Sequence, residues 1–381
     1  MPAVRRKENI IAAFFRRLLK PVFSKPVIWA ANKFSSAPNP LKVHESLSTL
    51  YALAYNEKDE RTEILSFDAS KDKVIIFSDH HKGTRDRRDD FADAEENYLR
   101  ALDYYNDQGY YYVNLGDSEE LWENTLLSVM SRNKRCFRKE KMFTDRDAYC
   151  KLVGNHDLFW REGIMPGTFL KRMYHKVIPV YEAVLLRFTT TAGLLEIFCT
   201  HGHQGDAQSD GNKFSKWFVS NIWGPVQAFL EINPNTPSTN DNLKTTHNQV
   251  MYEWSADQKK LALITGHTHQ PVFRSLTHLE RLLLNLEDAV KEGDANTINA
   301  VKAEVPRRRA EYDFVGESFR NMKPSYFNTG CCCFEDGTIT GIEIADGEIR
   351  LVKWASKNKE AERIAERYDV GELLKNLSVP Y

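Results

Sequence analysis

Short apolar runs along the chain end in polar side chains of the kind that bind metals. The first run, Val74 to Phe77, leads directly into Ser78-Asp-His-His81. Consecutive apolar and β-branched residues of this kind predict a buried β-strand. Four later runs end in the same way and are also predicted strands: Tyr110 to Leu115, Lys151 to Val153, Leu194 to Cys199, and Leu261 to Thr265.

The polar motifs that follow these strands contain glycine, Asp, Asn and His. In chain order they are Asp79-His-His81, Gly116-Asp117, Gly154-Asn-His-Asp157, His201-Gly-His203 and Gly266-His-Thr-His269. In open sheets, functional side chains converge beyond the carboxyl ends of the strands. We therefore expect the five motifs to form one shared site.

Helical and hairpin patterns complete the expected fold. Apolar residues three and four apart between Phe91 and Tyr105 predict a helix that ends near Gly109. Strand, helix and strand thus alternate, which indicates βαβ units and an α/β fold. We further expect a helix from Glu119 to about Ser131, and a strand hairpin over Thr338 to Trp354.

We expect the chain to have three parts: an N-terminal extension with a linker (1–40), the domain that carries the motifs (41–355) and a C-terminal tail (356–381). In the first part, eight Lys or Arg accompany one acid up to Ser35, and apolar pairs recur four apart. This predicts an amphipathic helix that either contacts an anionic membrane through residues 5–25 or packs on the domain. Residues 35–40 resemble a linker. The third part is expected to be a polar helix that ends in a short apolar stretch.

Two long inserts interrupt the predicted domain. The insert at about 204–260 leaves the sheet directly after His201, so it is placed either to cover the site as a lid or to add a helical pair at a sheet edge. The insert at about 278–314 is charged and predicted helical. Its Pro306-Arg-Arg-Arg309 run suggests a phosphate-binding cluster or a solvated helix face.

Composition excludes several classes of protein. A formal net charge of −1 argues against long nucleic acid as a partner. Six cysteines without CxxC spacing predict free thiols in a reducing compartment, and we interpret Cys331-Cys-Cys333 as a strand segment of small residues. No apolar run reaches the roughly 20 residues of a membrane span. We therefore expect a cytoplasmic protein, peripheral on the inner face of a membrane if the N-terminal helix binds lipid.

The motifs supply the ligands of a two-metal hydrolytic site, which needs a bridging carboxylate between its ions. The candidates are Asp79, His81 and His269 for one ion, Asn155, His201 and His267 for the other, and Asp117 for the bridge. Mixed oxygen and nitrogen ligands suit Mn²⁺, Fe or Zn²⁺. The set contains no thiolate, which argues against a structural zinc site.

Neighbouring residues are candidates for catalysis and substrate binding. His156 would protonate the leaving oxygen, and Asp157 would either orient His156 or form structural hydrogen bonds. His203 is a candidate for substrate contact, whereas His80 is expected to point away from the site. Arg85, with Lys82, Arg87 and Arg88, would grip a second phosphate or belong to a solvated loop.

Taken together, the five motifs make the chain resemble the calcineurin-like metallophosphoesterases, over about residues 71 to 355. The pattern is D-x-H at Asp79, GD at Asp117, GNH at Asn155, a lone histidine at His201, and G-H-x-H ending at His269. The resemblance implies a four-layer α/β/β/α sandwich with helical insertions, the dimetal ligand set given above, and His156 as the active-site histidine.

Within that family the chain differs from the protein Ser/Thr phosphatases, which carry Asp-Arg-Gly after the second motif. Its Gly116-Asp-Ser-Glu-Glu-Leu-Trp122 is similar to bacterial UDP-2,3-diacylglucosamine hydrolases, although that subgroup has Arg where His156 stands. We expect a phosphoesterase that cleaves a phosphoester or pyrophosphate bond by attack of a metal-bridging hydroxide on a small or lipid-linked substrate. The alternatives are a nucleotide phosphodiesterase or nuclease, and a non-catalytic scaffold.

Overall fold

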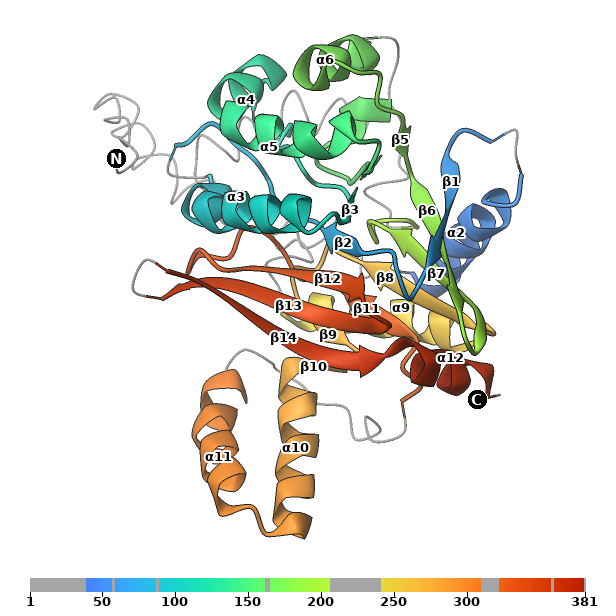
Figure 1. Cartoon of the computed structure of the whole chain (residues 1–381), viewed down its shortest axis with the longest axis vertical. Helices are drawn as coiled ribbons and strands as arrows, with labels where there is room; N and C mark the ends of the chain where they lie inside the picture. The colour runs from blue at the N-terminus through green and yellow to red at the C-terminus, as the bar shows by residue number, and fades with distance from the viewer. Residues whose placement is uncertain are drawn as a thin grey trace, which may run out of the picture.

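Among the residues that the structure describes, two seven-stranded sheets form the centre of the protein (Figure 1). The computed structural model describes residues 39–56, 59–86, 89–122, 124–161, 165–205, 241–309, 322–357 and 360–379. The predicted N-terminal amphipathic helix, most of the 204–260 insert, Arg87 and Arg88 lie outside these residues. Among the described helices, none is both long and apolar enough to cross a membrane.

The first sheet carries three of the predicted motif strands. In spatial order it contains β14 (Glu360–Asp369), β13 (Glu348–Lys357), β12 (Ile339–Ala345), β2 (Val74–Phe77), β3 (Tyr111–Asn114), β4 (Tyr149–Leu152) and β5 (Val180–Tyr181). Strands β2, β3 and β4 run parallel, with Phe77 beside Asn114 and Asn114 beside Lys151. Their following loops therefore begin at one edge of the sheet.

The second sheet carries the other two motif strands. Its order is β1 (Thr62–Asp68), β6 (Ala183–Thr190), β7 (Gly193–Thr200), β8 (Leu261–Thr265), β11 (Tyr326–Asn328), β9 (Val272–Phe273) and β10 (Leu276–Thr277). Strands β7 and β8 are parallel neighbours, so His201 and the Gly266–His269 motif leave the sheet at the same end. The five motifs were expected at one edge of a single sheet. In the structure they follow strands of two different sheets.

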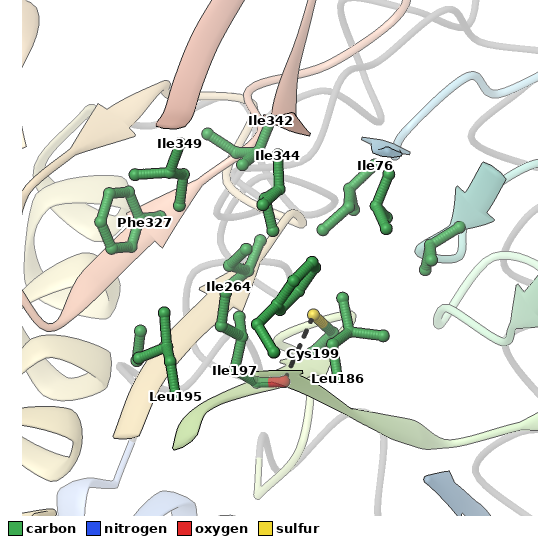
Figure 2. Close-up of a cluster of buried hydrophobic side chains, with 14 of the residues drawn as sticks. Ile76, Leu186, Leu195, Ile197, Cys199, Ile264, Phe327, Ile342, Ile344 and Ile349 are labelled. Atoms are coloured by element: carbon green, nitrogen blue, oxygen red, sulfur yellow. Dashed lines mark hydrogen bonds between the residues drawn. The ribbon is translucent and has the colours of Figure 1, made fainter. Parts of the chain in front are cut away.

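The main hydrophobic core lies between the two sheets. Figure 2 shows Ile76 and Ile342 from the first sheet facing Leu186, Ile197 and Ile264 from the second. All five side chains are fully buried. Burying one side chain of this size contributes about 1.5–3 kcal/mol, so this layer holds the two motif-bearing edges together.

Helices cover the outer face of each sheet, which confirms the predicted four-layer α/β/β/α sandwich. Helices α3 (Phe91–Asp107) and α5 (Lys134–Asp145) pack on the first sheet, where Tyr98 and Phe143 are buried. Helices α2 (Pro40–Leu53) and α9 (Asp241–Ala256) pack on the second sheet. Both α2 and β1 precede residue 71, so the fold begins earlier than the motif resemblance.

Smaller helices complete the first half of the chain. They are α4 (Leu126–Arg132), the 3₁₀ turn Leu158–Arg161 and α6 (Met165–Tyr174), which share a satellite cluster with α5 around Trp160 and Tyr174. The predicted helix from Glu119 to Ser131 is correct in its second half and wrong at its start. Residues Glu119 and Glu120 precede α4 because their carboxylates are bound by partners from other elements.

The prediction of a polar helix for the C-terminal part is wrong over its first half. Residues 360–369 form strand β14, which pairs with β13 along its whole length, and only then does α12 (Val370–Ser378) begin. A polar sequence suits this position because β14 is the edge strand of its sheet. The leucines of α12 close the core between the sheets.

The second insert is helical, as predicted, and its described part forms two helices joined by a short turn. Helices α10 (His278–Glu292) and α11 (Ala295–Arg309) extend away from the sheets at the bottom of Figure 1. Thr277 and Glu280 form a capping box that starts α10, and Gly293 ends it in the left-handed conformation. The side chains of the Pro306–Arg309 run lie outside the described residues. In the first insert, the described helix α9 covers a sheet face.

Candidate metal centre

Six of the seven predicted ligands form groups of potential metal ligands where the two sheets end together; the seventh, Asn155, precedes His156, whose backbone N–H contacts Asp117. The first group contains Asp79, His81 and His269, and the second contains Asp117, His201 and His267; the ligand atoms within each group lie within 4.8 Å of one another. His81 Nε2 is 3.1 Å from His269 Nε2, and His269 Nε2 is 3.3 Å from Asp79 Oδ1. A further group joins His81 and Asp117 with His156, and the division of the ligands between two ions stays a prediction.

Asp117 lies between the two groups. Its Oδ2 is 3.1 Å from His201 Nε2 and 3.7 Å from His81 Nε2, so one carboxylate oxygen faces a ligand from each group. Its other oxygen, Oδ1, accepts a hydrogen bond of 2.8 Å from the backbone N–H of His156. This is the arrangement required of the predicted bridging carboxylate.

Neighbouring groups hold the other ligands in orientation. His201 Nδ1 donates to the carbonyl of Leu115 at 3.0 Å, which leaves Nε2 directed at Asp117. Asp79 Oδ2 accepts from the backbone N–H of His267 at 2.9 Å, which leaves Oδ1 for the site. Such outer contacts fix the tautomer and direction of metal ligands.

The backbone at the site is unusual. Five of the predicted ligands have positive φ values: 51° at Asp79, 50° at His81, 48° at Asp117, 69° at His267 and 57° at His269. This conformation is uncommon for residues other than glycine, and such strain persists where the surrounding structure enforces it, often at functional sites.

Motif glycines allow the ligand loops to approach one another. A Cβ atom at Gly154 would collide with the backbone and side chain of Asp117, and one at Gly266 would collide with Asp79 and Ser78. The glycines of the Gly-Asn-His and Gly-His motifs are therefore required by packing between loops from different strands.

Buried atoms without hydrogen bonds test whether this site suits metal ions. Four predicted ligand atoms are buried without a hydrogen-bond partner: Asp79 Oδ1, Asn155 Oδ1, His201 Nε2 and His267 Nε2. Buried polar atoms rarely stay unpaired, because desolvation of such a group costs about 1–3 kcal/mol. The four atoms point to missing partners, and the donor set of the site fits two divalent cations.

The electrostatics favour cations as well. Burial alone would raise the pKa of Asp79, but His201 and His269 outweigh it and hold the pKa well below its ordinary value. Burial likewise opposes ionisation of Asp117, and His201 and His156 lower its pKa. Both carboxylates are therefore ionised at neutral pH. In turn, burial acts to lower the pKa of His201, whereas Asp117 and Asp79 raise it to about 9.

Glu120 is a site residue that the sequence analysis missed. Its Oε2 accepts hydrogen bonds from Nδ1 of His156 at 2.7 Å and from Nδ1 of His81 at 3.0 Å. Trp122 stacks on the His156 ring with centroids 4.0 Å apart and an angle of 17°. The Gly-Asp-x-x-Glu-x-Trp spacing was visible in the sequence, but it supported only a resemblance to a subgroup, not a role for Glu120.

Asp157 forms structural hydrogen bonds, which was one of the two roles expected for it; the other was to orient His156. Its carboxylate accepts from the backbone N–H of Gly154 at 2.7 Å and of Ser118 at 2.8 Å, so it ties the loops after β3 and β4 together. Burial raises its pKa to about 6. The carboxylate that contacts the His156 ring is that of Glu120.

Two of the basic residues after the first motif, which were predicted to contact a phosphate, have partners inside the protein. Arg85 donates to Glu95 and Asn133, both at 2.7 Å, and its guanidinium lies over the Phe91 ring. Lys82 is fully buried and pairs with Glu119 at 3.1 Å. Lys82 is thus fully paired inside the protein. Nη1 of Arg85 has no hydrogen-bond partner, so its contact with a phosphate stays a prediction.

His80 and His203, which each adjoin a predicted ligand in the sequence, lie in different surroundings. His80 is buried and its Nε2 contacts the hydroxyl of Tyr112 at 3.1 Å, on the helix-covered face of the sheet, so it points away from the site as expected. His203 is buried with its ring centroid 5.4 Å from that of His201. His203 thus remains a candidate for substrate contact.

Comparison with known proteins defines the class to which this fold and site belong. The family of calcineurin-like phosphoesterases matches residues 72–271, more than half of the chain. The chain therefore belongs to this family and is a metal-dependent phosphoesterase. No curated protein matched the chain.

Two solved structures were also found to be similar. Vacuolar Protein Sorting 29 from Cryptosporidium parvum aligns with 11% identity and a TM-score of 0.32, over 78% of this chain and 98% of that one. A single mutant of Vps29 from Entamoeba histolytica aligns with 11% identity and a TM-score of 0.30, over 78% and 99%. The similarity to UDP-2,3-diacylglucosamine hydrolases stays a prediction.

Proposed function

We propose that the chain hydrolyses a phosphoester or pyrophosphate bond in a small or lipid-linked molecule with two divalent ions. The observation that carries this proposal is the bridging position of Asp117 between the two ligand groups, with its Oδ2 facing His201 and His81. When bound, a pair of ions in such a site supplies an activated water molecule and neutralises charge on the phosphoryl oxygens. Mn²⁺, Fe and Zn²⁺ remain the candidate ions.

His156 is the proposed proton donor to the leaving oxygen. Glu120 accepts the hydrogen bond of its Nδ1, so Nε2 is the ring atom available to exchange a proton with a substrate. Trp122 covers one face of the ring and restricts its rotation. Glu120 and Trp122 are thus positioning residues in this proposal.

The described charges favour a small substrate over a polyanion. Lys82 and Lys151 are both fully buried and pair with Glu119, at 3.1 and 2.9 Å, and Arg85 pairs with Glu95. Within the described part of the chain, these cations near the site cannot form the basic track that long nucleic acid requires. Contact of residues 5–25 with an anionic membrane, and with it a peripheral location, remains part of the proposal.

Turnover of a substrate panel by the Mn²⁺-loaded protein tests the proposal. The panel contains bis(p-nitrophenyl) phosphate, p-nitrophenyl phosphate, nucleoside diphosphates and a UDP-linked lipid sugar. We expect turnover that is lost in Asp117→Asn and retained in Asp145→Asn, whose carboxylate pairs with Lys141 on the surface. No turnover of any compound by protein with bound Mn²⁺ would contradict the proposal and favour a scaffold.

A further inference from the structure

A second group of metal-binding atoms lies behind one of the predicted ligands. The sulfur atoms of Cys331 and Cys333 and a ring nitrogen of His269 lie within 4.8 Å of one another. Cys331 is fully buried and Cys333 is 7% exposed. These cysteines were predicted to be part of a strand, but they lie in the loop between β11 and β12.

The two ring nitrogens of His269 face different groups: Nε2 faces the candidate dimetal site and Nδ1 faces the cysteines. Its Nε2 is 3.3 Å from Asp79 Oδ1 and 3.1 Å from His81 Nε2, in the candidate dimetal site. Its Nδ1 is 3.9 Å from the sulfur of Cys333. Where His201 and His81 turn their Nδ1 atoms toward oxygen acceptors, His269 therefore turns its Nδ1 toward thiols.

The geometry suits a cation bound by sulfur and nitrogen. Tetrahedral zinc binds sulfur at about 2.3 Å and nitrogen at about 2.0–2.1 Å, so sulfur and nitrogen ligands lie roughly 3.6 Å apart. The observed 3.9 Å between Cys333 and His269 is close to this value. Thiolates select Zn²⁺, Cd²⁺ and Cu⁺ over Mn²⁺ and Mg²⁺, which prefer oxygen.

The loop that carries the thiols is fixed by the backbone. The N–H of Cys332 donates to the carbonyl of Asp79 at 3.1 Å, and the N–H of Thr340 donates to the carbonyl of Cys331 at 3.0 Å. The middle thiol belongs to a different environment: the sulfur of Cys332 contacts the carbonyl of Thr340 at 3.9 Å and packs in the core beneath α3. Cys332 is thus a natural internal control.

We propose that Cys331, Cys333 and Nδ1 of His269 bind one thiophilic cation of the zinc class, next to the dimetal site. A neutral imidazole carries a proton on one of its two nitrogens, so His269 can bind cations through both nitrogens only after losing that proton. Occupancy of one site therefore lowers the affinity of the other, and the coupling is reciprocal. The thiol site itself does not depend on phosphoesterase activity, since neither sulfur belongs to the predicted dimetal ligand set.

Cd²⁺ titration of the full, reduced chain tests the proposal, with thiolate-to-metal charge-transfer absorption as the readout. We expect the band to saturate at one equivalent in the unsubstituted protein. Cys331→Ser and Cys333→Ser should each weaken Cd²⁺ binding at least about 10-fold, the size of effect seen when metal-site partners are lost. Cys332→Ser should leave the band and the affinity unchanged. Asp117→Asn should keep the band, because it removes no sulfur, and this separates the site from the proposed active centre.

Absence of the band in the unsubstituted protein would overturn the proposal, as would equal bands in Cys331→Ser, Cys333→Ser and the unsubstituted chain. If the variants do not fold, zinc X-ray absorption on the unsubstituted protein with one equivalent of Zn²⁺ decides the matter. Two sulfur neighbours at about 2.3 Å would support the site, and a shell of nitrogen and oxygen alone would exclude it. Neither measurement uses turnover, so a negative result here is distinct from a failure of the proposed hydrolysis.

Discussion

Glu120 Oε2 lies 2.7 Å from Nδ1 of His156 and accepts its hydrogen bond. The same oxygen accepts from His81, a predicted metal ligand. Burial alone would raise the pKa of Glu120, but His156 and His81 hold it below its ordinary value, so the carboxylate is charged at neutral pH. One side chain thus orients both the proposed proton donor and a ligand.

Replacing Glu120 with Gln should lower kcat/KM by roughly 10- to 100-fold, the effect seen when an outer partner of a metal ligand is lost. The amide removes the negative charge, and its oxygen is a weaker acceptor than a carboxylate oxygen, so it holds the two imidazoles less well. Mn²⁺ affinity, measured by calorimetry, should also fall, because Glu120 orients the predicted ligand His81. Glu96→Gln is the control, since Glu96 is exposed and pairs with Arg135. Unchanged kinetics in Glu120→Gln would remove Glu120 from the proposed mechanism.

Mn²⁺ added to chelator-treated protein should stabilise the fold, because the ions bind the folded ligand set. One site contributes about 2.7 kcal/mol at a free ion concentration near 100 times Kd. Asp79→Asn should lose most of this gain, since Asp79 Oδ1 is 3.3 Å from His269 Nε2 within the first ligand group. Thermal unfolding with and without Mn²⁺ measures the effect. An equal gain in Asp79→Asn would show that Mn²⁺ binds elsewhere.

A methyl group at Gly154 should damage the site. The added Cβ would meet Asp117, so Gly154→Ala should destabilise the fold by about 1–3 kcal/mol and weaken Mn²⁺ binding through the displaced carboxylate. Urea unfolding and Mn²⁺ titration test this. Gly167→Ala in α6 is the matched control, because no atom lies within 4 Å of its Cβ position. Comparable results for both variants would contradict the packing argument.

His247 should make the metal-free fold sensitive to acid. Its Nε2 donates to the carbonyl of Gly202 at 2.7 Å, and burial lowers its pKa from 6.5 to about 4. Between these values the unfolded chain binds more protons than the folded one, so stability falls as the pH falls. The contribution is about 2 kcal/mol between about pH 8 and about pH 5.

Urea unfolding of chelator-treated His247→Gln and unsubstituted protein at these two pH values tests the prediction. Gln keeps a donor for Gly202 but does not titrate, so its loss of stability on acidification should be smaller by this amount. Equal losses in both proteins would show that His247 is not the source of the acid sensitivity.

Local pattern was sufficient to predict much of the fold. The strand over Val74–Phe77, the helix over Phe91–Asp107 and the hairpin of β12 and β13 all follow from spacing and turn residues within a few positions. The ordered motifs at strand ends also predicted six residues whose ligand atoms lie close together in the structure. Backbone geometry fixes these features, because periodicity decides which face of an element is buried and parallel strands end at one edge.

Contacts between distant segments decided the rest. The sequence could not show that Glu120 would reach His156, 36 residues away, or that Cys333 would lie beside His269, 64 residues away. It also predicted a helix where strand β14 forms, because that strand depends on pairing with β13. The sequence by itself determined the family and the candidate ligands. The packing of two sheets against each other decided which charged groups serve the site and which neutralise one another inside the protein, because a buried charge must find its partner wherever the fold places one.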